Sequence, residues 1–274
     1  MPSRKRKTDK KRRIVVIALV VLLLALSAVL LSPSCRSFVR QLPLVSQVEH
    51  FLFGVDPVIP EADAYGLDIS RYQGDIDWKS LRQIHFDPVT RRQLPSSNAA
   101  AVSISFIFAK ASEGATHVDS TIKRNRVNVR KLSIPFGAYH VLTLANSKAQ
   151  AANFISNAKL RKGDLVPVID LEEDILGSYA NNRVKDTLIN VAKRLARRYG
   201  HKPIIYGSHK YINRIGLPEG YPLWIARYRN GKCPQNADIW QFTDRGTVPG
   251  ISQYVDINAL YADRFRLSDY VLTK

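Results

Sequence analysis

Four acidic residues follow an apolar, strand-like run in the stretch PVIDLEED, residues 167–174. Asp170 and Glu172 are two positions apart, so in a strand they share a face at about 6.6 Å along the chain. Two neighbouring carboxyl groups raise each other's proton affinity, and surrounding aromatic side chains reduce their solvation. One of them can then stay protonated near neutral pH and protonate a leaving oxygen atom. This pairing indicates the chemistry of glycoside cleavage.

Polar and aromatic side chains also close most of the other strand-like runs of the sequence. Asp68 closes the first run, and Asp256 lies in the last. The remaining candidates at such positions are Lys110, Glu113, Tyr139, His140, Tyr206, Trp224, Arg227, Trp240 and Gln241. Each has an ordinary structural alternative, such as a helix cap, a turn, a core residue or a solvated charge. The predicted site therefore rests on acids from three different strands.

Eight short runs rich in Val, Ile, Phe, Tyr and Ala supply the strands that would position these residues. They span residues 65–70, 102–110, 134–142, 165–172, 202–208, 222–228, 237–243 and 255–260. Amphipathic stretches predict helices over residues 77–84, 119–132, 146–160 and 182–199. Strands that alternate with helices predict a parallel sheet covered by helices.

The alternation weakens after residue 200, where helices shorten and loops join the last strands. We therefore expect an α/β fold, a modified and irregular β/α barrel. It should be TIM-barrel-like, with eight strands, some antiparallel pairing and fewer helices in its C-terminal half. In such barrels the active site forms at the carboxyl ends of the strands. Residues 85–100 are polar and interrupted by proline, which predicts a surface insertion.

The amino-terminal region predicts a membrane anchor. Residues 1–13 contain eight Lys or Arg and one Asp, and residues 14–31 contain no charge. A helix over the second range rises about 27 Å, close to the hydrocarbon thickness of a bilayer. We expect a basic cytoplasmic tail, an uncleaved transmembrane signal-anchor helix over 14–31, a tether over 32–64 and a catalytic domain over 65–274. The alternative is a cleaved signal peptide, which usually has a shorter apolar region.

The predicted topology is a single-pass cell-membrane protein with its catalytic domain in the periplasm or on the cell surface. Lys and Arg number 41 against 23 Asp and Glu, a net charge of +18. This surplus suits a polyanionic partner, and general solubility is equally consistent with it. Export and the lack of a nucleic-acid motif argue against a nucleic-acid partner. Two cysteines, Cys35 and Cys233, exclude a disulfide framework and a cysteine-based metal site.

Ordered motifs between about residues 65 and 262 resemble a known family. They are GLDISRYQGDIDW, FIFAKASEG, PFGAYHVL, PVIDLEE, PIIYGS, PLWIARY, IWQFTDRGTVPGI and VDINAL. In this order and spacing they resemble the glycoside hydrolase family 25 lysozymes, which are N-acetylmuramidases. The resemblance implies a modified β/α barrel that cuts the β-1,4 bond between N-acetylmuramic acid and N-acetylglucosamine in peptidoglycan. It implies neither a metal nor an organic cofactor.

The resemblance also implies roles for individual residues. Glu172, the second acid of a D-x-E pattern, would be the general acid/base. Asp170 would orient or stabilise the substrate's N-acetyl group, and Asp68 and Asp256 would be further acidic site residues. The groove-lining residues would be Tyr72, Tyr139, Tyr206, Trp224 and Trp240. Lys110, taken from its position at a strand end, is a further predicted substrate contact.

Two departures from the family pattern bear on specificity. Arg71 and Tyr72 stand where family members commonly have histidine and tryptophan, and the segment 85–100 is long. Both features lie near the expected groove rim, so they affect substrate preference more than the chemistry. Two alternatives to a muramidase stay open: a catalytically silent peptidoglycan-binding barrel, and a hydrolase of another N-acetylated polysaccharide such as chitin.

Overall fold

A closed barrel of eight strands forms the centre of the structure, a computed structural model that describes residues 57–94, 99–228, 232–264 and 266–273. Its strands are β1 (Ala64–Ile69), β3 (Ala100–Glu113), β5 (Phe136–Val141), β6 (Val168–Leu171), β7 (Ile204–Ser208), β8 (Leu223–Ala226), β9 (Ile239–Gly246) and β10 (Val255–Leu260). They pair in the order β1-β10-β9-β8-β7-β6-β5-β3, and a β1–β3 pairing closes the ring. Only β10 runs antiparallel to both of its neighbours in this ring. The predicted mixed barrel is confirmed.

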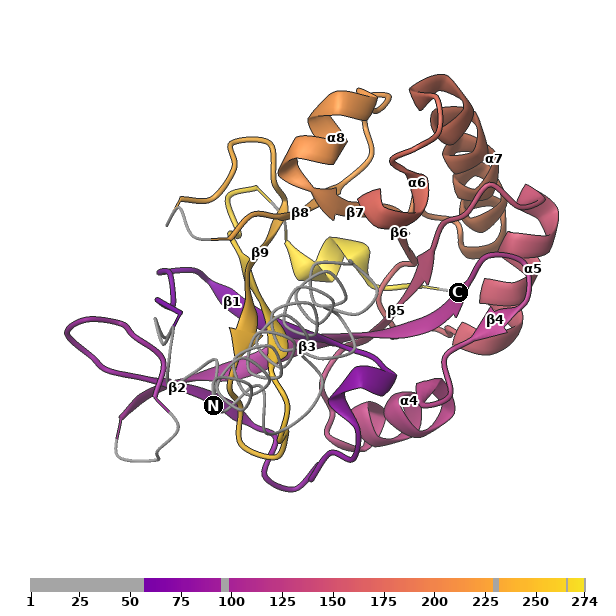
Figure 1. The fold of residues 1–274 in the computed structure, drawn as a ribbon. Helices are drawn as coiled ribbons and strands as arrows, with labels where there is room; N and C mark the ends of the chain where they lie inside the picture. The colour runs from indigo at the N-terminus through magenta and orange to yellow at the C-terminus, as the bar shows by residue number, and fades with distance from the viewer. Residues whose placement is uncertain (1–56, 95–98, 229–231, 265, 274) are drawn as a thin grey trace, which may run out of the picture. The chain divides into compact units, whose positions relative to one another are not determined.

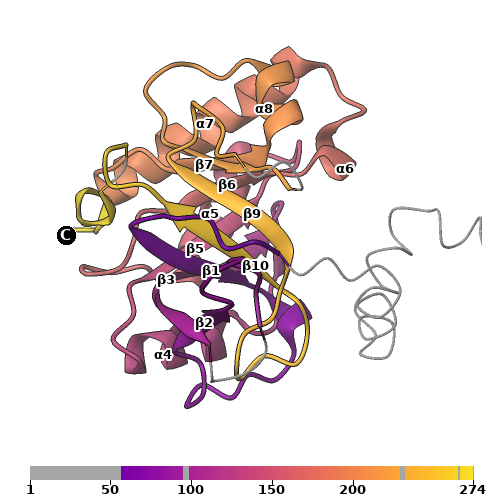
Figure 2. The same cartoon turned by 90° about the vertical axis from the view of Figure 1, so that its left-hand side faces the viewer.

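Helices surround part of the barrel (Figure 1). The described helices are α4 (Ile122–Lys131), α5 (Ser147–Ala158), α6 (Glu173–Leu176), α7 (Asn181–Tyr199) and α8 (His209–Ile215), with short 3₁₀ turns η1 (Arg71–Gln73) and η2 (Leu267–Tyr270). Two more strands, β2 (Gln83–Phe86) and β4 (His117–Val118), pair with β3 outside the ring. Figure 2 looks onto β1, β9 and β10, which no described α-helix covers. Beyond α8, which ends at Ile215, the described chain forms no further α-helix, in line with the predicted weakening of the alternation after residue 200.

Helix α7 shows how an amphipathic stretch becomes a helix. Val184, Leu188, Val191 and Leu195 recur every three or four residues, and all of them are buried. The helix ends where Gly200 adopts a φ of 78°, in the left-handed region that glycine enters without strain. Helices α4, α5 and α7 confirm three of the four predicted helices.

The fourth predicted helix, over residues 77–84, does not form. The carboxylate of Asp77 accepts hydrogen bonds from the Lys79 amide at 3.1 Å and the Ser80 hydroxyl at 2.6 Å. These bonds close a turn that competes with a helix for the same backbone groups. The chain then enters β2, which pairs antiparallel with the first residues of β3.

Residues 85–100 are not simply a surface insertion. His85 and Phe86 belong to β2 and are buried. Gln93 is buried as well, and its side-chain amide exchanges two hydrogen bonds with the backbone of Thr247. Polar composition concealed this packing because a buried amide is tolerated when its hydrogen bonds are satisfied.

The packed domain begins before residue 65. Ile59 is fully buried, and its amide donates to the Arg91 carbonyl at 2.8 Å. The Arg91 Nε donates in turn to the Ile59 carbonyl at 2.7 Å. Residues 57–63, assigned to the tether from sequence, therefore pack with this domain, which forms one compact unit from Gly54 to Lys274.

The predicted basic tail and membrane helix, residues 1–31, lie outside the described residues. Cys35 lies outside them too. Within the ranges that the structure describes, no helix has both the length and the apolar character needed to cross a membrane.

Candidate active site

Asp68 lies near the carboxyl end of β1 and is only 7% exposed. Its Oδ2 accepts hydrogen bonds from the side-chain amides of Gln241 on β9, at 2.9 Å, and Asn258 on β10, at 2.8 Å. Burial raises the pKa of Asp68, and these two hydrogen bonds oppose the rise because they favour the charged form. Asp68 is therefore held as an oriented, hydrogen-bonded carboxylate.

Aromatic donors fix the orientation of both amides. The hydroxyl groups of Tyr206 and Tyr228 donate to Gln241 Oε1, at 2.7 and 2.6 Å. The indole N–H of Trp224 donates to Asn258 Oδ1 at 2.7 Å. Because each amide oxygen already accepts hydrogen bonds, each amide NH₂ group must face the carboxylate on β1.

Asp256 is the register partner of Asp68 across the antiparallel pair of β1 and β10, and the two carboxyl groups share a hydrogen bond. Burial raises the pKa of Asp256 well above its usual range, and the charge of Asp68 raises it further. The hydrogen bond between them lowers the pKa of Asp68 and raises that of Asp256, so Asp256 is the one of the two that holds a proton more tightly.

Asp170, on β6, is 4% exposed, and its Oδ1 has no hydrogen-bond partner among the described residues. Burial raises its pKa well above the usual range, the charge of Glu172 adds to the rise, and Lys110 opposes it. Buried polar atoms are almost always paired. An unpaired carboxyl oxygen beside a cavity is therefore a place where a ligand's N–H or O–H can bind.

Glu172 follows β6 and is exposed to solvent, in contrast to Asp170. It occupies the N-cap position of α6, yet its side chain makes no capping hydrogen bond. Desolvation by the surrounding protein raises the pKa of Glu172, and the positive charge of Lys110 offsets part of this rise. A carboxyl group with a raised pKa and access to solvent suits proton exchange with a substrate.

Lys110, on β3, forms an ion pair with a nearby acid. Its Nζ is 2.7 Å from Glu113 Oε2. The charge of Lys110 also lowers the pKa of Asp170 and Glu172, which opposes the rise caused by burial.

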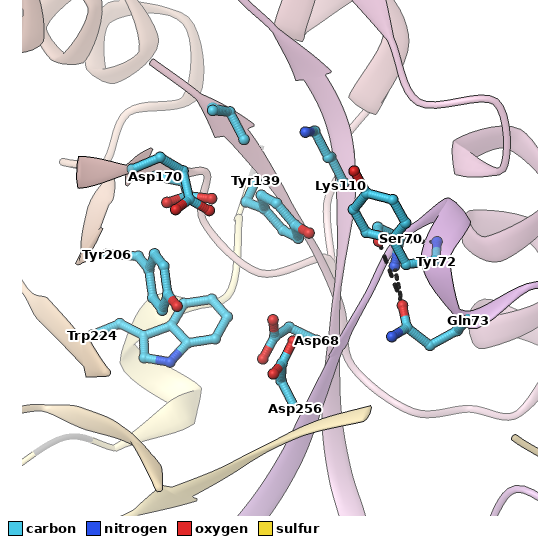
Figure 3. A pocket seen from close by; sticks show the side chains of 12 residues that line it. Asp68, Ser70, Tyr72, Gln73, Lys110, Tyr139, Asp170, Tyr206, Trp224 and Asp256 are labelled. Atoms are coloured by element: carbon cyan, nitrogen blue, oxygen red, sulfur yellow. Dashed lines mark hydrogen bonds between the residues drawn. The ribbon is translucent and has the colours of Figure 1, made fainter. Parts of the chain in front are cut away.

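These groups line one cavity of about 160 Å³. Figure 3 shows Asp68, Asp170 and Asp256 with their carboxyl groups turned toward the space between them. The lining residues are Asp68, Ser70, Tyr72, Gln73, Lys110, Tyr139, Val141, Asp170, Glu172, Tyr206, Trp224 and Asp256. All four predicted catalytic acids are among them, together with five of the six predicted substrate contacts.

Trp240 does not line this cavity, in contrast to the prediction. It is buried, its indole N–H donates to the Arg227 carbonyl at 2.9 Å, and its ring centroid is 5.7 Å from that of Phe242. Successive side chains of a strand point to opposite faces. Because Gln241 turns toward Asp68, its neighbour Trp240 turns away from the site.

The tyrosines in the cavity remain hydrogen-bond donors at neutral pH. Burial raises the pKa of Tyr139 and of Tyr206 well above the usual value of 10, and nearby carboxylates raise both further. Tyr72 differs from them because it is 40% exposed at the rim. Because the Tyr206 hydroxyl already donates to Gln241, the site offers a ligand the Tyr139 phenol inside and the Tyr72 ring at its edge.

Sequence reasoning missed the residues that hold Asp68 in place. From sequence, Gln241 is a polar strand residue without an assigned role, and Asn258 lies outside the predicted site. Strand alternation contained the signal, because Asn258 lies two positions after Asp256 on β10. Tyr228 follows β8, where the loop sets its direction, so no sequence pattern identifies it.

The chemistry available here is that of carboxyl groups. In the part of the chain that the structure describes, no group of three or more His, Cys, Asp or Glu side chains is arranged to hold a metal ion. Glu172 can exchange a proton, and Asp170 offers an unpaired acceptor. Asp68, the more readily ionised of the pair with Asp256, can stabilise a developing positive charge when it is ionised.

Comparisons with known sequences support this interpretation. The sequence profile described as "Glycosyl hydrolases family 25" matches residues 67–251. The uncharacterized protein YegX of Escherichia coli (strain K12) is 30% identical over 201 residues, covering 71% of this chain and 68% of that protein. Lysozyme M1 of Streptomyces globisporus is 24% identical over 221 residues, covering 74% of this chain and 69% of that protein.

Solved structures have the same fold. A family 25 glycosyl hydrolase from Bacillus anthracis has a TM-score of 0.59 at 26% identity, covering 73% of this chain and 89% of that one. The bacterial lysozyme from Streptomyces coelicolor has a TM-score of 0.60 at 25% identity, covering 73% of this chain and 94% of that one. The profile spans more than half of the sequence and includes the cavity residues from Asp68 to Trp224. The chain belongs to glycosyl hydrolase family 25, and it is a glycoside hydrolase.

Proposed function

We propose that this hydrolase is a peptidoglycan muramidase that cuts the β-1,4 bond between N-acetylmuramic acid and N-acetylglucosamine, with Glu172 as the general acid/base. The observation that carries the proposal is a cavity lined both by an exposed Glu172 with a raised pKa and by the buried Asp170, whose Oδ1 has no hydrogen-bond partner among the described residues. The similarity to proteins named lysozymes supports peptidoglycan as the substrate.

The reaction begins with Glu172 protonated. It donates its proton to the glycosidic oxygen as the bond between that oxygen and the anomeric carbon breaks, so the leaving sugar departs as an alcohol. The anomeric carbon becomes electron-poor and oxocarbenium-like. Glu172, now a carboxylate, takes a proton from the water that adds to this carbon, which restores the starting state.

The other acids act on the sugar without exchanging its protons. Asp170 Oδ1, which lacks a partner within the described chain, accepts the N–H of the substrate's acetamido group. Asp68, when it is ionised, stabilises the positive charge that develops in the transition state. The phenol of Tyr139 remains protonated and donates a hydrogen bond to a sugar oxygen, while the Tyr206 hydroxyl stays bonded to Gln241.

Mass spectrometry of soluble products tests the bond and the substrate. The purified full-length protein is incubated with peptidoglycan and, separately, with chitin. We expect fragments from peptidoglycan that end in reducing N-acetylmuramic acid. Fragments ending in reducing N-acetylglucosamine would contradict the assigned bond. Products from chitin alone would indicate another polysaccharide substrate, and binding to peptidoglycan without products would indicate a wall-binding barrel.

We also propose that residues 14–31 anchor the chain in the cell membrane, with the tail cytoplasmic and the hydrolase domain outside. The support is the uncharged apolar run and the eight basic residues that precede it. Membranes containing the full-length chain should retain it through alkaline carbonate extraction and release it in detergent. Release by carbonate alone would contradict the anchor.

A further inference from the structure

Arg71 is a cation at the edge of the catalytic cavity without an acidic partner. It lies three positions after Asp68, its side chain is exposed, and its neighbour Tyr72 lines the cavity. None of the ion pairs among the described residues involves Arg71. Within the described chain, no direct contact with an acidic side chain therefore neutralises the Arg71 guanidinium.

The backbone under Arg71 is held from two sides. Ser70 and Gln73 form a reciprocal capping box around η1, and the Gln73 side-chain amide donates to the Tyr254 carbonyl at 3.1 Å. The Arg71 amide donates to Oδ2 of the buried Asp119 at 3.1 Å. The fold itself therefore fixes the point from which the arginine side chain starts.

Two side chains that are not acids orient the guanidinium. Nη2 of Arg71 donates to the Tyr72 hydroxyl at 3.2 Å, and Nη1 lies 3.4 Å from His117 Nε2. The guanidinium carbon lies 5.0 Å from the centroid of the Tyr72 ring. A guanidinium has about five N–H donors, so these contacts set its plane and leave donors for a ligand.

We propose that Arg71 forms a carboxylate-binding subsite that favours glycan strands with acidic substituents over neutral strands such as chitin. This inference rests on the proposed muramidase function. A carboxylate is the planar anion that an oriented guanidinium binds through two parallel hydrogen bonds. Peptidoglycan offers carboxylates near the scissile bond from two sources, the stem peptide and, where the stem is absent, the lactyl group of N-acetylmuramic acid. Chitin has neither.

Binding constants separate these sources. Dissociation constants are measured by calorimetry with the full-length protein in the Glu172→Gln background, so that turnover is slow compared with the measurement. The ligands are soluble glycan fragments with stem peptides, the same fragments after an amidase has removed the stems and exposed the lactyl carboxylates, and chito-oligosaccharides. Adding Arg71→Gln should weaken binding of the carboxylate-bearing fragments about tenfold and leave chito-oligosaccharide binding unchanged.

The matched control is Arg198→Gln. Arg198 is also exposed and stacks on a tyrosine, with its guanidinium carbon 5.5 Å from the Tyr199 ring centroid, but it lies in the last turn of α7, outside the cavity lining. It should not change binding of any ligand. Weakening by Arg71→Gln only with stems present assigns the stem carboxylates, and weakening only after their removal assigns the lactyl group.

Turnover provides an independent readout. In the otherwise wild-type protein, Arg71→Gln should raise KM for stem-bearing fragments about tenfold with little change in kcat, because the contact is made equally in the ground and transition states. Equal dissociation constants with and without Arg71→Gln, for every ligand, would overturn the inference. Absence of products from the wild type would instead overturn the muramidase proposal, and the binding comparison would still decide the role of Arg71.

Discussion

Replacing Gln241 with methionine should impair catalysis by releasing Asp68, since methionine nearly conserves the side-chain length while removing the amide. The change deletes the donor 2.9 Å from Asp68 Oδ2 and the oxygen that accepts hydrogen bonds from Tyr206 and Tyr228. A hydrogen bond to a charged group contributes about 1.5–3 kcal/mol. If that stabilisation is expressed in the transition state, kcat/KM falls roughly 10- to 150-fold.

The pH profile should change as well. The hydrogen bond from Gln241 lowers the pKa of Asp68 against the effect of burial. Without it the pKa rises further, so the ionised form is reached only at higher pH. The acidic limb of the kcat/KM profile should therefore move to higher pH. Loss of the acceptor for two hydroxyl groups should also lower the free energy of unfolding, by about 2–4 kcal/mol.

Gln93→Met is the matched control for this experiment. Gln93 and Gln241 are each 1% exposed, but Gln93 bonds the backbone of Thr247 and lies outside the cavity lining. Kinetics of reducing-end release and thermal unfolding are measured for both variants. The control should lose stability and keep the wild-type kcat/KM. If Gln241→Met also kept kcat/KM and its acidic limb, the network around Asp68 would have no catalytic role.

Three further predictions concern buried groups and the barrel wall. Asp170→Asn removes a carboxyl group whose folded pKa lies well above its reference value of 3.8. The folded state binds the Asp170 proton more tightly than the unfolded state does. The contribution of Asp170 to the free energy of unfolding therefore falls as the pH rises above about 4. The difference in Tm between Asp170→Asn and the wild type should therefore shift in favour of the variant as the pH rises from about 4 to about 8. A difference in Tm that stays constant over this range would contradict the raised pKa. Burial lowers the pKa of His140 to about 4. Its contribution to the free energy of unfolding is therefore complete above about pH 6.5 and is lost as the pH falls toward 4, because the unfolded chain binds the proton first. An NMR titration should find its ring neutral at about pH 5, and a charged ring there would contradict the burial argument. Gly66→Ala would place a Cβ atom 2.1 Å from a Phe106 ring carbon. The free energy of unfolding should therefore fall by about 1–3 kcal/mol or more. An unchanged Tm would show instead that the barrel accommodates the added methyl group.

The barrel could be predicted because its strands are buried on both faces and therefore appear as continuous apolar runs. The segment FIFA within β3 is an example, with Phe106, Ile107, Phe108 and Ala109 all fully buried. The turn at Asp77 could not be predicted from periodicity, because its side chain captures amides that a helix would otherwise use. At this turn the hydrogen bonds of the Asp77 side chain determine the backbone structure, although the apolar periodicity of the sequence predicts a helix.

The acids of the site were predictable for a related reason. Asp170 and Glu172 stand at a strand end, and parallel strands bring such ends together. The amides that hold Asp68 come from positions 173 and 190 residues further along the chain, and only the closed barrel brings them within hydrogen-bond distance. Long-range pairings of this kind leave no local pattern in the sequence.

The most direct test of the account compares Glu172→Gln with Glu173→Gln. The two acids are adjacent, but Glu173 lies outside the cavity lining and is 3.1 Å from Arg214 in an ion pair. The rate of reducing-end release from peptidoglycan is measured with the full-length protein and both variants. The account predicts that Glu172→Gln lowers kcat by about 10²- to 10⁴-fold, the contribution of a general acid/base, while Glu173→Gln stays near wild type. Wild-type turnover by Glu172→Gln would contradict it.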